Sequence, residues 1–303
     1  MPLSGVSRHF KVFIVSIRGK GPMLNQLVSA EWLQTHLSDT DLRVLDASYH
    51  LPNAHRNADL EFIEGHIPGA VRFDIDEIKA LDNPLPHMLP SPEEFDAAMQ
   101  DLGVGAEMQI VVYDTQGLFS AARAWWMFRY FGHDRVAVLD GGLPAWQAAG
   151  GALESGRGRV FPPKYPFKSK SRAHWVVTAD EILKGLDSKE HTILDARARP
   201  RFVGEVEEPR PGMRSGHIPG SHNVPFSSLL DAETLMLLPK AELEARFNQF
   251  DLDHTQVVVS CGSGVTACVL ALAMDVVGLT EPKLYDGSWS EWGSQEDWPV
   301  ETG

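Results

Sequence analysis

Short runs of apolar residues alternate with longer amphipathic stretches along most of the chain. Residues 110–113 and 257–259 are apolar runs of this kind, and after a short loop each leads into a helical pattern, at 121–131 and 267–277. Apolar runs bounded by turn residues predict buried strands, and the alternation of strand with helix predicts a mainly parallel sheet. The pattern therefore predicts an α/β fold in which helices flank a parallel sheet.

The same pattern occurs twice, because residues 28–151 align with residues 177–293 in five blocks of the same order. The paired blocks are 28–31 with 177–180, 44–47 with 193–196, 65–70 with 216–221, 110–114 with 257–261, and 139–146 with 285–292. We therefore expect two like α/β domains, at residues 27–152 and 174–303. The intervening stretch 153–173, rich in Pro, Lys, Arg, Ser and Gly, predicts an exposed linker.

Composition narrows the class of protein. The 303 residues are 43% hydrophobic and 22% charged, which is typical of a soluble protein with a core in each domain. The net charge of −14 argues against nucleic acid and anionic membranes as partners, and no apolar run reaches the roughly 18 residues of a membrane span. The two cysteines fit neither a disulfide framework nor a common metal spacing, so we expect a reducing compartment, no metal and no cofactor.

The N-terminus has a composition of its own. Four cations, Arg8, Lys11, Arg18 and Lys20, precede the first acidic residue, Glu31. An organelle-targeting segment, a short signal-like segment and an upstream start with Met23 as the working initiator all fit this pattern. We expect residues 1–26 to be an extension outside the fold. The cytoplasm is the expected location, with an organelle as the alternative if residues 1–22 are a targeting segment.

Cys261 is the residue that points to chemistry. It ends the predicted strand 257–260 and opens the loop Cys261–Thr266, which runs into an apolar helix. Backbone N–H groups and the helix dipole stabilise a thiolate at such a position, and Gly262 and Gly264 allow the backbone to come close to the sulfur. We therefore predict a cysteine nucleophile, the alternative being a small buried hydrophobe. Cys268, among Ala and Leu in the helix, is expected to be core.

The repeat serves as an internal control for this prediction. At the position of Cys261 the first copy has Asp114, and its loop 115–120 lacks the compact Gly-Ser-Gly pattern. Only the second domain is expected to carry thiol chemistry, while the first packs against it and shapes the cleft. Asp140 and Asp286 are interpreted as turn-forming carboxylates.

The tandem arrangement and the loop Cys261–Thr266 resemble the tandem-domain rhodanese superfamily, and within it the 3-mercaptopyruvate sulfurtransferases, over residues 27–297. The resemblance implies a transferase that moves sulfur from 3-mercaptopyruvate through a Cys261 persulfide to a thiol acceptor, such as thioredoxin or a small thiol, or to cyanide, with release of pyruvate. Thiosulfate-specific members usually carry basic residues where Gly262 and Ser263 stand. A thiosulfate sulfurtransferase and a non-enzymatic persulfide carrier or sensor stay as alternatives, whereas a cysteine phosphatase would need an arginine at Ala267.

The substrate and persulfide contacts are expected around this loop. The backbone N–H groups of residues 262–266, which are Gly262, Ser263, Gly264, Val265 and Thr266, would surround the outer sulfur. The resemblance further implies that Arg201 and Arg210 bind the substrate carboxylate and carbonyl, and that Arg56 supports the site from the first domain. Paired guanidinium hydrogen bonds suit a carboxylate. The alternative for Arg201 and Arg210 is that they are solvated and pair with the acidic run 205–208.

A proton relay completes the expected site. The resemblance implies that Ser263 acts with a histidine and an aspartate of the first domain, and His66 matches that histidine. A histidine can supply the proton that the leaving enolate needs near neutral pH. The aspartate expected eleven residues before His66 is His55 in this chain, so Asp59 is considered instead. His217 stands at the equivalent place in the second copy, which makes a structural role for both histidines the alternative.

Overall fold

The structure, a computed structural model, describes residues 25–188, 190–250, 252 and 255–303. It contains two five-stranded sheets with the same strand order, β1-β5-β4-β2-β3 and β6-β10-β9-β7-β8, and every pairing within them is parallel. The strands are β1 (Leu27–Val28), β2 (Leu42–Asp46), β3 (Val71–Arg72), β4 (Gln109–Tyr113), β5 (Val136–Leu139), β6 (Val176–Val177), β7 (His191–Asp195), β8 (His222–Asn223), β9 (Gln256–Ser260) and β10 (Lys283–Tyr285). The predicted fold class and repeat are confirmed.

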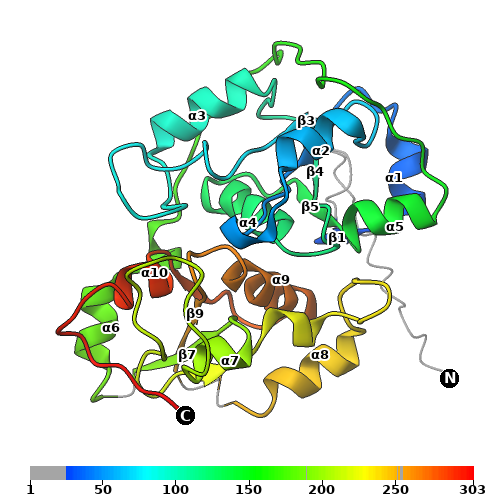
Figure 1. Cartoon of the computed structure of the whole chain (residues 1–303). Helices are drawn as coiled ribbons and strands as arrows, with labels where there is room; N and C mark the ends of the chain where they lie inside the picture. The colour runs from blue at the N-terminus through cyan, green and yellow to red at the C-terminus, as the bar shows by residue number, and fades with distance from the viewer. Residues whose placement is uncertain (1–24, 189, 251, 253–254) are drawn as a thin grey trace, which may run out of the picture.

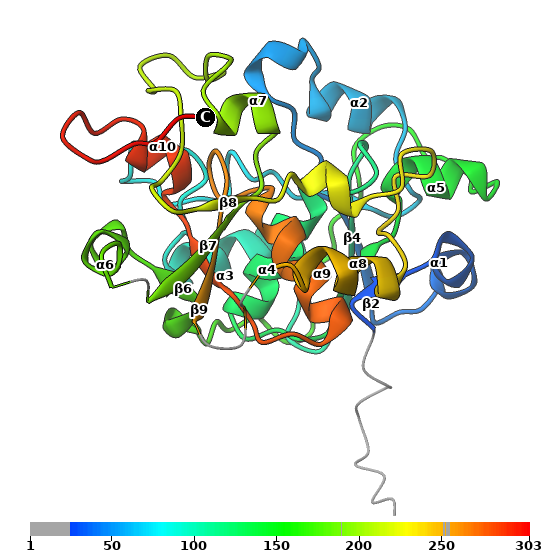
Figure 2. The same ribbon diagram turned by 90° about the horizontal axis from the view of Figure 1, so that it is seen from below.

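Helices flank both sheets (Figure 1). The first half contains α1 (Ala30–His36), α2 (Ala58–Glu64), α3 (Pro92–Asp101), α4 (Ala121–Tyr130) and α5 (Gly142–Ala148), and the second contains α6 (Ala179–Gly185), α7 (Arg199–Phe202), α8 (Lys240–Phe247), α9 (Ala267–Val277) and α10 (Ser288–Trp292). Short 3₁₀ turns are formed by Pro52–Ala54, Ala173–Trp175 and Phe226–Leu229. The hydroxyls of Ser29 and Thr178 accept backbone N–H groups of the first turns and so cap α1 and α6. In Figure 2 the second sheet lies between α6 on one side and α8 with α9 on the other.

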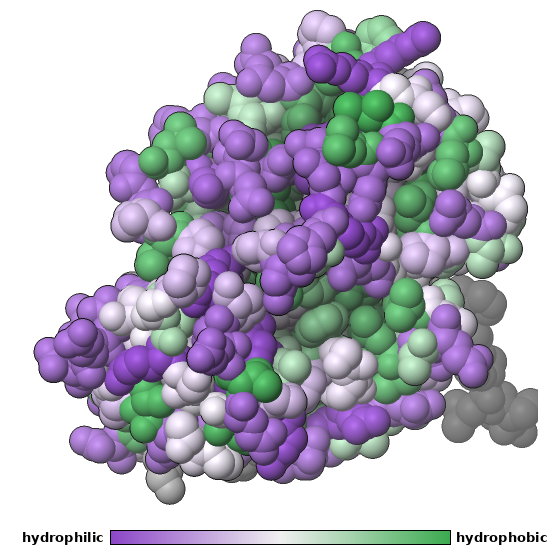
Figure 3. All heavy atoms as spheres, in the orientation of Figure 1, coloured by the Kyte–Doolittle hydropathy of each residue, from purple (hydrophilic) through white to green (hydrophobic). Residues whose placement is uncertain are grey.

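Helices α4 and α9 lie between the two sheets and form the centre of the molecule (Figure 1). Residues 121–128 and 267–274 are all buried, so each helix is covered on every side, and both belong to one continuous core cluster that includes residues of both halves. On the face shown in Figure 3, hydrophilic residues predominate and hydrophobic ones show in the seam between the halves. The two halves therefore share a core.

A charged contact joins the two central helices near their ends. Arg129 of α4 and Asp275 of α9 occupy the same position in their helices, and their Nη1 and Oδ1 atoms are 3.1 Å apart. Nη2 of Arg129 also lies 3.3 Å from Oε2 of Glu281, and its guanidinium lies 4.6 Å above the ring of Trp125. Equivalent positions of the repeat thus carry opposite charges that meet across the seam.

The stretch expected to be an exposed linker is exposed only in part. Val160, Phe161 and Tyr165 are exposed, but Phe167 is buried against the ring of Phe95, and Lys170 N–H donates to the carbonyl of the first domain's Phe131. The connection is therefore attached to the first domain. The expected domain bounds stay a prediction, and residues 1–24 of the expected N-terminal extension lie outside the described residues. Within the described residues, no helix is long and apolar enough to span a membrane.

Candidate active site

Cys261 follows β9 at the carboxyl edge of the second sheet and begins the loop that leads into α9. Its side chain is buried, and the Oγ of Ser288 accepts hydrogen bonds from the N–H groups of Cys261 (3.2 Å) and Gly264 (3.1 Å). The N–H groups of residues 262, 263, 265 and 266 donate to no acceptor within the described residues. A loop in front of a helix N-terminus with free N–H groups is suited to negative charge on a bound atom.

The equivalent loop of the first copy is closed on an anion of its own. The carboxylate of Asp114, at the position of Cys261, accepts hydrogen bonds from the N–H groups of Gln116 (2.8 Å), Phe119 (2.7 Å) and Ala121 (2.9 Å). Asp114 is fully buried, and burial raises the pKa of its carboxyl group. This loop geometry therefore binds a negatively charged group in the copy that cannot perform thiol chemistry.

Arg201 and Arg210 converge on the cysteine loop. A Cβ atom added at Gly262 would lie 3.1 Å from Nη2 of Arg201 and 3.9 Å from Nη1 of Arg210. Arg210 also donates to the hydroxyls of Ser263 (3.4 Å) and Tyr49 (3.3 Å). Two guanidinium groups thus stand beside the cysteine loop, where they supply local positive charge in a chain of net negative charge.

Arg201 takes part in an ion pair at the same time. The carboxylate of Glu208 accepts hydrogen bonds from both Nε and Nη2 of Arg201, and its Oε1 lies 3.0 Å from Nη1 of Arg197. Arg197 is buried, pairs with Asp195 at 2.7 Å and lies over the ring of Trp289. Arg201 therefore pairs with the acidic run and also lies beside the cysteine loop. The ion pair and a role in the site, which were considered as alternatives, are compatible. Glu208 holds one edge of the guanidinium and leaves Arg201 beside Gly262.

A chain of hydrogen bonds leads from the cysteine loop into the first domain. Ser263 Oγ lies 2.9 Å from Nδ1 of His87, and His87 Nε2 lies 2.9 Å from Oδ1 of Asp76. The hydrogen bond from His87 lowers the pKa of Asp76, and burial lowers the pKa of His87. Because an ionised carboxylate only accepts hydrogen bonds, Nε2 carries the imidazole proton and Nδ1 accepts the hydroxyl proton of Ser263. The first domain thus contributes a neutral histidine to the site.

Comparison with known proteins decides the family. The family model described as a rhodanese-like domain matches residues 29–149 and 178–295, which is most of the chain in two copies. The chain belongs to the rhodanese-like family.

Its relatives cover nearly the whole chain. A 3-mercaptopyruvate sulfurtransferase from Escherichia coli is 44% identical over 276 residues, covering 90% of this chain and 97% of that protein. A thiosulfate/3-mercaptopyruvate sulfurtransferase, described as mitochondrial, from Arabidopsis thaliana is 42% identical and covers 91% of this chain and 78% of that protein. Among solved structures, SseA from Escherichia coli superposes with a TM-score of 0.79 at 42% identity, covering 88% of this chain and all of that one.

The interpretation of His66 as the partner of Ser263 is wrong in this rhodanese-like chain. His66 is fully buried, its Nδ1 bonds to the carbonyl oxygen of Phe62 at 2.7 Å, and its ring stacks on that of Phe62. His217 makes the same contacts with Phe202 in the second copy, at 2.8 Å and with the same stacking. Both histidines therefore stabilise the loop of their own domain, which is the structural alternative that the repeat raised.

Of the two other first-domain residues named from the sequence, Asp59 was interpreted wrongly, whereas the role of Arg56 stays a prediction. Asp59 pairs with Arg72 at 3.0 Å and does not orient a histidine. Arg56 pairs with Glu61 at 2.7 Å, donates to the hydroxyl of Thr115 at 3.3 Å and lines one pocket with Tyr49 and Asp76, so its support of the substrate site from the first domain stays a prediction. Cys268 is buried as expected, and burial raises the pKa of its thiol to about 12.

Sequence reasoning missed His87 and Asp76, although a signal for them was present. The aspartate was expected eleven residues before the histidine, and eleven residues separate Asp76 from His87. The match to the family pattern instead placed the histidine at His66. Applied to every histidine of the first domain, the spacing leaves two candidate pairs, Asp39 with His50 and Asp76 with His87, and the structure brings the second to Ser263.

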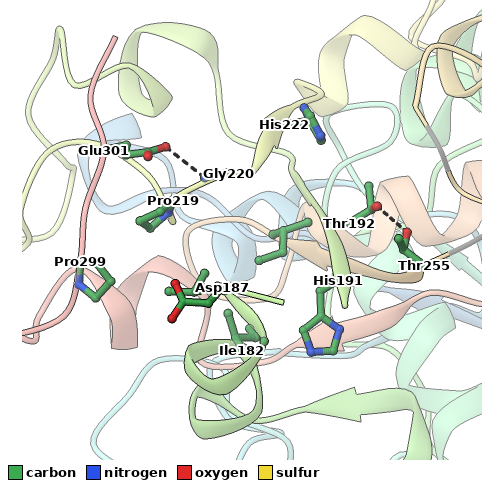
Figure 4. A pocket seen from close by; sticks show the side chains of 13 residues that line it. Ile182, Asp187, His191, Thr192, Pro219, Gly220, His222, Thr255, Pro299 and Glu301 are labelled. Carbon is green, nitrogen blue, oxygen red and sulfur yellow. Dashed lines mark hydrogen bonds between the residues drawn. The ribbon is translucent and has the colours of Figure 1, made fainter. Parts of the chain in front are cut away.

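A separate pocket of about 700 Å³ lies at the opposite edge of the second sheet (Figure 4). It is lined by His191 and Thr192 at the start of β7, by Thr255 before β9, and by Pro219 and Glu301. Ligands of open parallel sheets bind at the carboxyl ends of the strands, where Cys261 lies, and not at their beginnings. The pocket in Figure 4 is therefore not part of the candidate active site.

Proposed function

We propose that this chain is a 3-mercaptopyruvate sulfurtransferase that uses Cys261 as its nucleophile. The observation that carries the proposal is the hydrogen-bonded chain from Ser263 to His87 and Asp76 beside the cysteine loop. A proton relay is needed only for a donor whose leaving group must be protonated. When mercaptopyruvate gives up its sulfur, the leaving group is the pyruvate enolate, a carbanion equivalent that must be protonated. Thiosulfate instead releases sulfite. The relay therefore favours mercaptopyruvate as the donor.

The first half-reaction transfers the donor sulfur to Cys261. The Cys261 thiolate attacks the mercaptopyruvate sulfur, an S–S bond forms, the C3–S bond breaks, and its electron pair leaves on C3 as the pyruvate enolate. The proton of the donor thiol passes through Ser263 to Nδ1 of His87, where Asp76 stabilises the imidazolium, and then returns through Ser263 to C3. The products are pyruvate and a Cys261 persulfide anion, which the free N–H groups of the loop stabilise.

The second half-reaction regenerates the enzyme. An acceptor thiolate attacks the outer sulfur, the acceptor leaves as a persulfide, and Cys261 returns to the thiolate. A small thiol or a redox protein such as thioredoxin is the proposed acceptor, with cyanide as an acceptor in the assay. The cytoplasm is the proposed location, an organelle being the alternative if residues 1–22 are a targeting segment.

Gly262 supports the choice of donor. In the relatives that prefer thiosulfate, positive charge is expected on the loop itself, but a side chain at 262 would begin 3.1 Å from a nitrogen of Arg201. Loop cations and the Arg201–Arg210 pair are therefore competing ways of placing positive charge beside the sulfur. The pair suits a donor with a carboxylate and a carbonyl, because each guanidinium presents several donors in one plane.

The proposal is tested by comparing two donors and two arginines of α7. Mercaptopyruvate with a thiol acceptor should give a higher kcat/KM than thiosulfate with cyanide. Arg201→Ala should lower kcat/KM for mercaptopyruvate about ten- to a hundredfold, the cost of roughly one charge-assisted hydrogen bond. Arg199 is an exposed residue of the same helix, so Arg199→Ala is the matched control and should leave kcat/KM for both donors unchanged. A higher kcat/KM with thiosulfate contradicts the donor assignment.

A further inference from the structure

A buried arginine of the first domain contacts both loops of the proposed relay. Arg123, on α4, is 1% exposed, and its Nη2 donates to the carbonyl oxygen of His87 at 2.6 Å. Its Nη1 lies 2.8 Å from Oδ1 of Asp286 and 3.4 Å from the carbonyl oxygen of Gly264 in the cysteine loop. One guanidinium therefore links the histidine loop, the cysteine loop and the carboxylate that follows β10.

Asp286 holds the histidine loop at a second point. Its Oδ2 accepts the N–H of Leu89 at 2.7 Å, while Arg123 holds the carbonyl of His87. The backbone is thus fixed on both sides of residue 88. His87 has φ of 60°, in the left-handed region that costs a residue with a side chain about 1 kcal/mol or more. The two contacts hold the histidine in this unfavourable conformation, in which Nδ1 faces Ser263.

The repeat contains the same loop without the arginine. Asp140, the first-copy counterpart of Asp286, accepts the N–H of Leu237 at 2.9 Å, and Leu235, two residues earlier, has φ of 59°. Leu235 therefore occupies the place of His87 across the seam. The counterpart of Arg123 on α9 is Val269. The carboxylate contact and the left-handed residue belong to the fold, whereas the arginine occurs only on the side where the loop carries a histidine.

Burial of an arginine is unfavourable unless its charge and hydrogen-bond donors are satisfied. Arg123 is buried on α4, although its counterpart on α9, Val269, shows that an apolar residue fits this helix position. Its planar guanidinium contacts three oxygen atoms of three segments at once, which a single ammonium group cannot reproduce with the same geometry.

We propose that Arg123 and Asp286 are positioning residues that align His87 of the first domain with Ser263 of the second. The inference rests on the proposed mercaptopyruvate reaction, because only that donor uses the relay. The pair sets the register between the two loops and does not touch the substrate. Its loss should slow transfer from mercaptopyruvate much more than transfer from thiosulfate.

The experiment compares Asp286→Asn with Asp140→Asn. In both variants the amide keeps an oxygen for the leucine N–H, but at 286 it presents no charge to Arg123, so the comparison isolates the ion pair. We expect Asp286→Asn to lower kcat for mercaptopyruvate about ten- to a hundredfold, with thiosulfate turnover and the rate of Cys261 alkylation by iodoacetamide changed less than about threefold. Arg123→Lys keeps the positive charge but not the planar guanidinium, so it should retain only part of the activity with mercaptopyruvate. Asp140→Asn should behave as the unaltered enzyme.

The outcomes separate this inference from the proposed function. His87→Gln is the reference variant: if it leaves mercaptopyruvate turnover unchanged, the relay itself is wrong. If His87→Gln slows that reaction while Asp286→Asn matches Asp140→Asn, the relay stands and the positioning role is overturned. Equal losses with both donors in Asp286→Asn also overturn it, because that result indicates general damage to the cysteine loop. Circular dichroism and thermal unfolding of each variant identify any variant that is not folded. If Asp286→Asn is not folded, the activity of Arg123→Lys with the two donors tests the positioning role instead.

Discussion

The loops of Asp114 and Cys261 are two versions of one structure. Both follow the third strand from one edge of a parallel sheet, and both lead into a buried helix. In the first, a carboxylate of the chain takes three N–H groups. In the second, the N–H groups of residues 262, 263, 265 and 266 have no acceptor in the described part of the chain, and a thiol stands at the strand end. The difference indicates that the same loop leaves N–H groups available to a bound anion where the chain supplies no carboxylate of its own.

The residue that closes each loop differs in a corresponding way. Gly142 has φ of 55°, and a Cβ there would lie 2.3 Å from the carbonyl oxygen of Asp114. Its counterpart Ser288 has φ of 50° and is not a glycine, but its hydroxyl accepts two N–H groups of the cysteine loop and donates to the carbonyl of Tyr285 at 2.8 Å. The second copy accepts backbone strain and gains a hydroxyl that fixes the loop.

The largest difference in sulfur transfer should appear between variants of the two strand-end residues, Cys261 and Asp114. Cys261→Ser should abolish sulfur transfer from either donor, because the hydroxyl forms no persulfide, and mass spectrometry should detect no persulfide after treatment with mercaptopyruvate. Asp114→Asn should leave transfer unchanged and cost about 1 to 2 kcal/mol of unfolding free energy, since an amide cannot accept all three N–H groups. Loss of transfer in the Asp114 variant would mean that the first loop is more than structural.

An intermediate effect should come from the residues that close the loops. Ser288→Gly relieves the left-handed strain but removes the hydroxyl, so we expect little change in melting temperature, a kcat about tenfold lower with both donors, and slower alkylation of Cys261. Gly142→Ser, the reverse change in the first copy, should lower the melting temperature through the clash with Asp114 and leave kcat unaltered. Unchanged kinetics in Ser288→Gly would remove the hydroxyl from the description of the site.

The smallest effect concerns the charges in the seam. Burial raises the pKa of Glu281 to about 7, so the folded state binds a proton that the unfolded state has released above its ordinary pKa of 4.5. Its contribution to stability is complete below pH 4.5 and is lost as the pH rises through 7. Glu281→Gln should therefore stabilise the protein at pH 8 relative to pH 5 by on the order of 1 kcal/mol in denaturant unfolding. A difference of the opposite sign would show that Arg129 keeps this carboxylate ionised.

The sequence predicted what depends on local pattern and on the repeat. Strands, the parallel sheets and the place of Cys261 all follow from residues close in the chain. The relay does not, because Ser263 and His87 are 176 residues apart and meet only when the two halves pack. The turn interpretation of Asp286 missed its contacts with Arg123 and Leu89 for the same reason. Such contacts leave no periodic signal in either segment.

The opposite charges of Arg129 and Asp275 also restrict which halves can associate. If either half were expressed alone and formed a symmetric pair through its central helix, the equivalent positions would meet as Arg129 with Arg129 or Asp275 with Asp275, and like charges would face each other in a largely apolar seam. Pairing of unlike halves brings the two signs together. The divergence of one position in a duplicated helix thus disfavours homodimers of either half and selects the single-chain arrangement.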